Sequence, residues 1–170
     1  HLAAPVGSEL VRFHQLARTL REQCPWDQEQ THQSLVRYLL EETYEVVDAL
    51  HALDPEDPTT DDALIEELGD LLYQIEFHAT IAEQEGRFTM ADVAQGVHDK
   101  LVRRHPHVFG EARVAGAAEV LVQWDEIKRR EKAAAGGAAP ERTLAGVPLG
   151  LPALVRADAL SRKAARVGFD

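Results

Sequence analysis

The chain has 170 residues, the length of one domain or of one domain with an appended segment. Its 18 basic and 29 acidic side chains give a formal net charge of −11, which argues against a nucleic-acid polymer as partner, since such binding needs a basic face. No apolar run approaches the length of a membrane span, and no signal peptide is apparent, so we expect a cytoplasmic protein with no membrane partner. The single cysteine, Cys24, excludes an internal disulfide and a zinc site built from several thiolates.

Apolar residues recur at three- and four-residue spacing, and no segment alternates with the period of a strand. The pattern predicts an all-α fold. Pro25 ends the first helix, and a proline-containing turn at residues 54–60 separates the second helix from the third. Thr89, with Asp92 three residues later, is the expected N-cap of the fourth helix. The expected helices cover residues 9–23, 34–53, 61–85, 90–104 and 117–134.

The composition also predicts how the chain is divided. Residues 1–132 are expected to form the main helical domain, and the Ala- and Gly-rich residues 133–140 are typical of a linker. Residues 141–170 carry apolar side chains but are too few to bury a core of their own. We expect a helical tail that packs on the main domain, pairs with another subunit, or belongs to a further segment.

Acidic residues are paired on the two helices that flank the turn at residues 54–60. Glu42 and Glu45 are three residues apart on one helix, and Glu67 and Asp70 are three apart on the next, so each pair shares a helix face. Counted outward from the middle of the turn, the two pairs lie at the same height of an antiparallel hairpin. On a helical wheel both pairs lie beside the apolar stripe that is expected to form the core. The four acids are therefore predicted to face one another at the edge of the core.

Four carboxylates at close range repel one another, and residues 38–86 contain no Lys or Arg that would offset their charge. Such pairs are commonly a solvated surface, but their matched height and lack of basic partners favour a metal site. All-oxygen ligands suit Mg²⁺, with Mn²⁺ as the alternative. A di-iron site is disfavoured, because it needs a Glu-x-x-His pair on each of two helices, and neither Glu42 nor Glu67 has His at that spacing.

The densest positive charges of this acidic chain are Lys100, Arg103 and Arg104, at the end of a predicted helix. The helix dipole alone favours cations at this end. Lys and Arg are also suited to holding phosphate oxygens. The sequence leaves both interpretations open.

Two tryptophans are ambiguous in the same way. Trp26 is suited either to stacking on a base or to covering the core. Trp124 and Lys128, one turn apart, allow the same two interpretations. His78, two turns beyond Asp70, is interpreted as a histidine satisfied within the fold rather than as a metal ligand.

Three blocks of sequence occur in one order. They are Cys24-Pro-Trp-Asp-Gln-Glu-Gln-Thr31, the combination of Glu41-Glu42-x-x-Glu45 with Glu67-x-x-Asp70, and Lys100-Leu-Val-Arg-Arg-His-Pro-His-Val-Phe109. Together they resemble the MazG family of nucleoside triphosphate pyrophosphohydrolases over about residues 9–132. The resemblance implies four-helix units that assemble as an intertwined homodimer or as a tetramer.

The resemblance also implies Mg²⁺-dependent hydrolysis of a ribo- or deoxyribonucleoside triphosphate to the monophosphate and pyrophosphate. Glu41 matches the residue proposed to orient or deprotonate the attacking water. The basic block matches residues associated with the phosphates, and Trp26 and Lys128 are further candidates for substrate binding. The residues that match the family's metal ligands are Glu42, Glu45, Glu67 and Asp70.

Residues 147–154 and 163–170 resemble the segment that opens the second repeat of two-domain MazG proteins. The two halves of such proteins need not be equally active. The alternative function is therefore a non-catalytic, metal-binding module for dimerisation or regulation.

Overall fold

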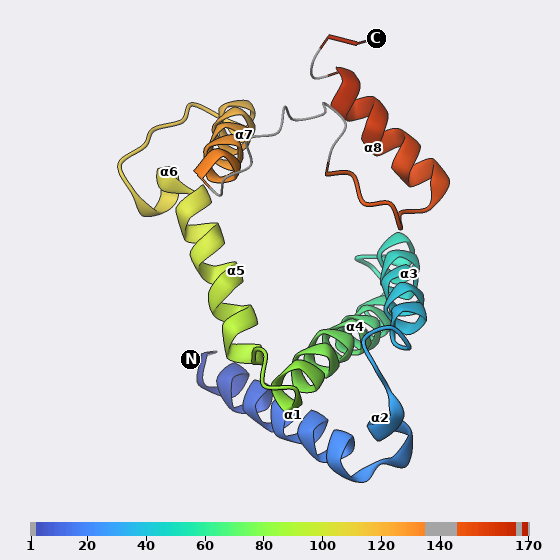
Figure 1. The fold of residues 1–170 in the computed structure, drawn as a ribbon. Helices are drawn as coiled ribbons and strands as arrows, with labels where there is room; N and C mark the ends of the chain where they lie inside the picture. Colours follow the sequence, from blue (N-terminus) through green and yellow to red (C-terminus); the bar gives the residue numbers. More distant parts are fainter. Residues whose placement is uncertain (1–2, 135–145, 166–167, 170) are drawn as a thin grey trace. The chain divides into compact units, whose positions relative to one another are not determined.

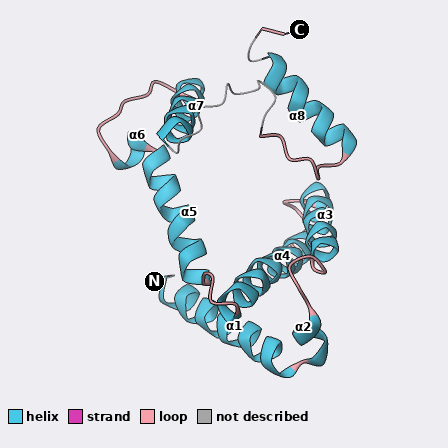
Figure 2. Ribbon diagram, in the orientation of Figure 1, coloured by secondary structure: helices cyan, strands magenta, loops and turns pink. Residues whose placement is uncertain are grey.

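The computed structural model describes residues 3–134, 146–165 and 168–169. Within these ranges the chain is helical, and Figure 2 shows helices joined by loops with no strand. This confirms the predicted all-α class, and none of the helices described is long and apolar enough to cross a membrane. The helices are α1 (Ala3–Gln23), α2 (Pro25–Glu29), α3 (Val36–Ala52), α4 (Thr59–Gln84), α5 (Met90–Arg104), α6 (Pro106–Phe109), α7 (Ala117–Ala134) and α8 (Ala153–Ala165) (Figure 1).

Two short helices, α2 and α6, were not expected from the sequence. Each begins with a proline, Pro25 in α2 and Pro106 in α6. Proline has no amide hydrogen, but the first turn of a helix does not need one, and the fixed φ angle of proline suits that position. The two prolines therefore start a new helix as well as ending the preceding one.

The chain divides into two compact units, His1–Arg103 and Arg104–Asp170. In the first unit α4 packs on α3 and on α1, and α1 also packs on α2. The second unit contains α7 and α8, so part of the predicted tail is helical. Most of the predicted linker at 133–140 and the start of the tail lie outside the described residues, and the predicted domain limits stay predictions.

The α3–α4 hairpin is closed by side chains of its turn. Asp54 Oδ1 accepts a hydrogen bond of 2.9 Å from the Glu56 amide, and Asp57 Oδ1 accepts one of 3.0 Å from the Thr59 amide. The Thr60 hydroxyl accepts a third, of 3.1 Å, from the Asp54 amide. Such side-chain to backbone contacts stabilise tight turns. They set the register in which the acidic residues of α3 lie opposite those of α4.

The buried core of the first unit is smaller than the apolar stripes of the sequence predict. Leu35, Phe77 and Ile81 contact one another, and Tyr38 and Tyr73 pack around them. Other members of the predicted stripes are between 41% and 67% exposed. They are exposed because α1, which packs on α4, does not cover the whole α3–α4 hairpin. These exposed residues are Val36, Leu40, Leu50, Ile65, Leu68 and Ile75.

Candidate metal centre

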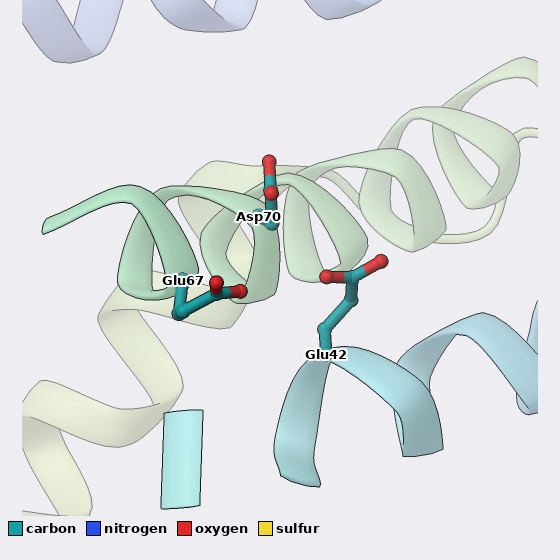
Figure 3. Close-up of side chains that lie close together, drawn as sticks. All are labelled: Glu42, Glu67 and Asp70. Atoms are coloured by element: carbon teal, nitrogen blue, oxygen red, sulfur yellow. The ribbon is translucent and has the colours of Figure 1, made fainter. Parts of the chain in front are cut away.

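Three carboxylates from neighbouring helices converge in the first unit. Glu42 projects from α3 toward Glu67 and Asp70 on α4 (Figure 3). One carboxylate oxygen from each residue lies within 4.8 Å of the others, a spacing that small side-chain rotations would close around a shared cation. Glu42 and Glu67 are partly buried and Asp70 is exposed. The structure thus brings together three of the four residues predicted as metal ligands.

The fourth predicted ligand, Glu45, borders this group. It lies one turn after Glu42, is exposed, and is not among the three residues whose oxygens converge. Its charge acts electrostatically on both Glu42 and Glu67. Its ligation of a metal stays a prediction.

Burial and mutual repulsion raise the pKa of two carboxyls of the group. The pKa of Glu42 is raised first by partial burial and then by the charges of Asp70 and Glu45. The pKa of Glu67 is raised first by loss of solvation and then by the charges of Glu45 and Glu66. In the metal-free protein the ionised form of these groups is therefore disfavoured. A cation would offset this cost, and a donor set made only of carboxylate oxygens fits a hard divalent ion such as Mg²⁺.

Glu41 lies beside the group on α3, with an exposed side chain. Arg37, one turn earlier, acts electrostatically on Glu41. The Arg37 guanidinium lies 4.4 Å from the centroid of the Tyr38 ring and donates a hydrogen bond to the Tyr38 hydroxyl. Arg37 was not expected at this site, although a cation four residues before an acid on a helix is a recognisable signal.

Trp26 lies on α2 and packs against the first turn of α3. Its side chain is 47% exposed, and its ring meets the Tyr38 ring edge-on, with centroids 5.6 Å apart and planes at 79°. The indole thus packs on the fold with one part and faces solvent with another. Its contact with a base stays a prediction.

A hydrogen-bond network fixes the segment that carries Trp26. Asp27 is buried and accepts a hydrogen bond of 2.9 Å from the Tyr73 hydroxyl on α4. Burial and this contact raise the pKa of Tyr73, so the hydroxyl stays a donor. Arg21 of α1 donates to the backbone carbonyls of Asp27 and Gln30. This network was not expected from the sequence, because it joins residues from three helices and one turn.

The predicted phosphate-binding residues lie on α5 and α7. Lys100 and Arg103 are on α5, a helix with no buried side chain among those described. Arg104, at the end of α5, forms an ion pair of 2.7 Å with Glu131. Lys128 lies 4.8 Å from the centroid of the Trp124 ring and 3.5 Å from Asp125. Arg104 and Lys128 therefore have partners on α7, and a role toward phosphate stays a prediction for all four cations.

Residues 30–109 match the family model described as the MazG nucleotide pyrophosphohydrolase domain. The nucleoside triphosphate pyrophosphohydrolase of Escherichia coli K12 is 44% identical over 161 residues, which are 95% of this chain and 58% of that protein. The nucleoside triphosphate pyrophosphohydrolase/pyrophosphatase MazG of Thermotoga maritima is 41% identical over 162 residues, again 95% of this chain and 58% of that protein.

The nucleoside triphosphate pyrophosphohydrolase of Mycobacterium tuberculosis is 40% identical over 165 residues, which are 96% of this chain and 47% of that protein. The chain thus spans less than two thirds of the length of each of these three relatives. The match over residues 30–109 contains both acidic helices and the turn between them. The chain belongs to the MazG family, with its nucleotide pyrophosphohydrolase domain at residues 30–109.

Proposed function

We propose that this chain is a Mg²⁺-dependent nucleoside triphosphate pyrophosphohydrolase that converts a ribo- or deoxyribonucleoside triphosphate to the monophosphate and pyrophosphate, in sanitation or regulation of the nucleotide pool. The observation that carries the proposal is the convergence of Glu42, Glu67 and Asp70 across the α3–α4 hairpin. The names of the relatives support the substrate class.

In this proposal Glu42, Glu67 and Asp70 hold the cation, with Glu45 as a further ligand. Mg²⁺ suits these oxygen donors, and so does Mn²⁺. A bound divalent cation would neutralise phosphate oxygens and make the phosphorus more electrophilic. The carboxylates alone would repel a triphosphate, which carries about four negative charges near neutral pH.

Glu41 is the proposed general base. The oxygen of water bonds to one of the first two phosphorus atoms, and the bond from that atom to the oxygen bridging the two breaks. The bridging oxygen leaves with pyrophosphate if the first phosphorus is attacked, or with the monophosphate if the second is attacked, and the carboxylate of Glu41 accepts a proton from the water. Glu41 is exposed and is not one of the three converging carboxylates, which suits a residue that acts on water. The proposed phosphate and nucleoside contacts are Lys100, Arg103, Arg104, Lys128 and Trp26.

The exposed apolar face of the α3–α4 hairpin supports assembly as a homodimer or a tetramer. Ile65 is 67% exposed, Leu68 48% and Leu40 45%, although all three belong to the apolar stripes of their helices. Apolar side chains left exposed on both helices of one hairpin favour an interaction site there. A second copy of the chain, contributing its own hairpin, would cover this face and complete the four-helix unit that the family resemblance implies.

Product analysis tests the proposed reaction. The chain is incubated with each nucleoside triphosphate in Mg²⁺ or in EDTA, beside Glu42→Ala and the control Glu56→Ala, which removes an exposed acid of the turn. Monophosphate and pyrophosphate should form only with Mg²⁺, and only Glu42→Ala should abolish them. Metal binding without turnover of any nucleotide would instead favour the non-catalytic module for dimerisation or regulation.

A further inference from the structure

A histidine pair joins the start of α3 to α4, outside the carboxylate group. His32 lies in the turn before α3 and His78 lies on α4, with their Nδ1 atoms 2.8 Å apart and their ring planes within 7° of parallel. The ring centroids are 5.1 Å apart. With the Nδ1 atoms 2.8 Å apart, two imidazole rings reach this separation only when the line between the two nitrogens runs close to both ring centres. The rings therefore point at each other edge to edge. Both Nδ1 atoms are directed along one line, which suits a shared hydrogen and not a shared metal ion.

The surroundings assign that hydrogen to His32. Arg87, in the turn after α4, donates a hydrogen bond to His32 Nε2. Because this nitrogen accepts, the neutral ring carries its hydrogen on Nδ1 and donates it to His78 Nδ1, which leaves the hydrogen of His78 on Nε2. A second proton on His32 would have to bind Nε2, which already faces the Arg87 donor. A second proton on His78 would have to bind Nδ1, which already faces the His32 donor. Protonation of either ring thus breaks the chain of hydrogen bonds.

Few charged groups surround the pair. Arg87 is also ion-paired with Glu85, at 2.5 Å, and Arg21 of α1 donates to the Gln30 carbonyl, two residues before His32. No carboxylate contacts either imidazole among the residues described. Burial, followed by the influence of His32, lowers the pKa of His78 below its ordinary value of 6.5. The stability gained from neutral His78 is therefore complete above that ordinary value and is lost as the pH falls through the lowered pKa.

The pair closes the open end of the hairpin that carries the carboxylates. His32 is four residues before α3, the helix of Glu42. On α4, Asp70, Gln74 and His78 follow one another at four-residue spacing, along one stripe of the helix. Of these three, Gln74 is buried, His78 is partly buried and Asp70 is exposed. The carboxylates thus lie between the turn at residues 54–60 and the histidine contact, so that one end of the hairpin is held by backbone and the other by these two rings.

We propose that His32, His78 and Arg87, here named the histidine clamp, are positioning residues for the metal centre. The neutral clamp holds α3 against α4 so that Glu42 meets Glu67 and Asp70, and acid opens it and weakens cation binding. This proposal rests on the metal centre of the proposed function but not on turnover.

Mn²⁺ affinity, measured by electron paramagnetic resonance, tests the clamp with three variants. His78→Asn keeps a hydrogen-bond acceptor close to the Nδ1 position but does not titrate, and His78→Phe removes the acceptor. His98→Asn is the matched control, since His98 is exposed on α5 and contacts Asp99. Between about pH 7.5 and about pH 5.0, a range that extends well below the ordinary pKa of histidine, the unaltered chain and His98→Asn should lose about fivefold in affinity. His78→Asn should lose clearly less, and His78→Phe should bind weakly at both values. An equal loss in His78→Asn and the unaltered chain would overturn the proposal.

Nitrogen-15 spectra of the histidines in the unaltered chain test the same proposal without a variant. We expect the Nδ1–H tautomer for His32, the Nε2–H tautomer for His78, and a further fall in the His78 pKa in saturating Mg²⁺, because linkage is reciprocal. An Nδ1–H tautomer at His78, or a pKa that Mg²⁺ leaves unchanged, would overturn the clamp. Neither measurement requires nucleotide hydrolysis, so a chain without turnover would still give a clear answer.

Discussion

The hydroxyl of Tyr73 donates a hydrogen bond of 2.9 Å to Asp27 Oδ1 and so joins two residues that are 46 positions apart. Asp27 is only 6% exposed, and the Tyr73 ring packs on Phe77, with centroids 5.5 Å apart. The contact anchors α2, and with it Trp26, on the helix that carries Glu67 and Asp70. A candidate nucleoside contact and two candidate metal ligands are therefore tied to one helix.

Tyr73→Phe should lower the free energy of unfolding by about 1–3 kcal/mol, because it leaves the buried Asp27 carboxylate without this donor. Urea denaturation measures the change. Tyr38→Phe is the control, since the Tyr38 hydroxyl accepts a hydrogen bond from the exposed Arg37, and it should cost less. Equal losses in the two variants would contradict a special role for the buried contact.

Local sequence patterns were enough to predict the longer helices and one cap, but not the short helices α2 and α6. The bounds of α5 and α7 agree with the expected ranges, and Thr89 caps α5 as predicted: its amide donates to Asp92 Oδ2 at 2.8 Å, and its hydroxyl accepts from the Asp92 amide at 3.3 Å. The meeting of Glu42 with Glu67 and Asp70 follows from the position of the turn and the geometry of antiparallel helices. These features depend on neighbours in the chain or on a single hairpin.

Features that depend on distant residues could not be predicted in this way. Neither the contact of Asp27 with Tyr73 nor that of His32 with His78 follows from periodicity, because helical spacing does not say which loop residue reaches which helix. The extent of the core was overestimated for a related reason. An apolar stripe predicts a buried face, but it does not say which element covers that face, and Ile65, in the stripe of α4, is 67% exposed.

Phe77→Ala should lower the free energy of unfolding by about 3–5 kcal/mol, because the ring is 1% exposed and its removal leaves a cavity between α3 and α4. The same substitution at Phe169, which is 76% exposed, should change it by less than about 0.5 kcal/mol. Chemical denaturation of both variants measures the difference. A small effect of Phe77→Ala would mean that the core lies elsewhere.

Glu67→Gln should raise the melting temperature in EDTA and reduce the further rise that Mg²⁺ produces. The pKa of Glu67 is raised above its ordinary value of 4.5, so the ionised carboxylate destabilises the metal-free fold at neutral pH, and this cost disappears as the pH falls through the raised pKa. Thermal denaturation with and without Mg²⁺ tests both effects. Glu56→Gln, in the exposed turn, should change neither. A lower melting temperature in EDTA with a full response to Mg²⁺ would refute the assignment.

Glu41→Gln should separate water activation from metal binding. Loss of a general base typically costs about 10²–10⁴-fold in turnover, whereas a residue outside the ligand set leaves the affinity for Mn²⁺ nearly unchanged. Turnover and Mn²⁺ affinity are measured on the same preparation. Parallel losses of turnover and affinity would make Glu41 a ligand, and full activity would remove it from the mechanism.

Ile65→Lys should shift the chain from dimer toward monomer, because it places a charge on the exposed apolar face of α4, where the native side chain is 67% exposed. Sedimentation velocity measures the mass in solution. Leu154→Lys, at a residue of α8 that is 85% exposed, is the control and should leave the assembly intact. An unaltered chain that sediments as a monomer at all concentrations would contradict the proposed homodimer.

An anomalous difference map from crystals soaked in Mn²⁺ shows whether the carboxylates of α3 and α4 form the metal centre. We expect a peak in contact with carboxylate oxygens of Glu42, Glu67 and Asp70, and no such peak in Glu42→Ala crystals. A peak bound only by other residues would contradict this assignment. So would the absence of any peak in crystals of a protein that hydrolyses nucleotide with Mn²⁺ in solution.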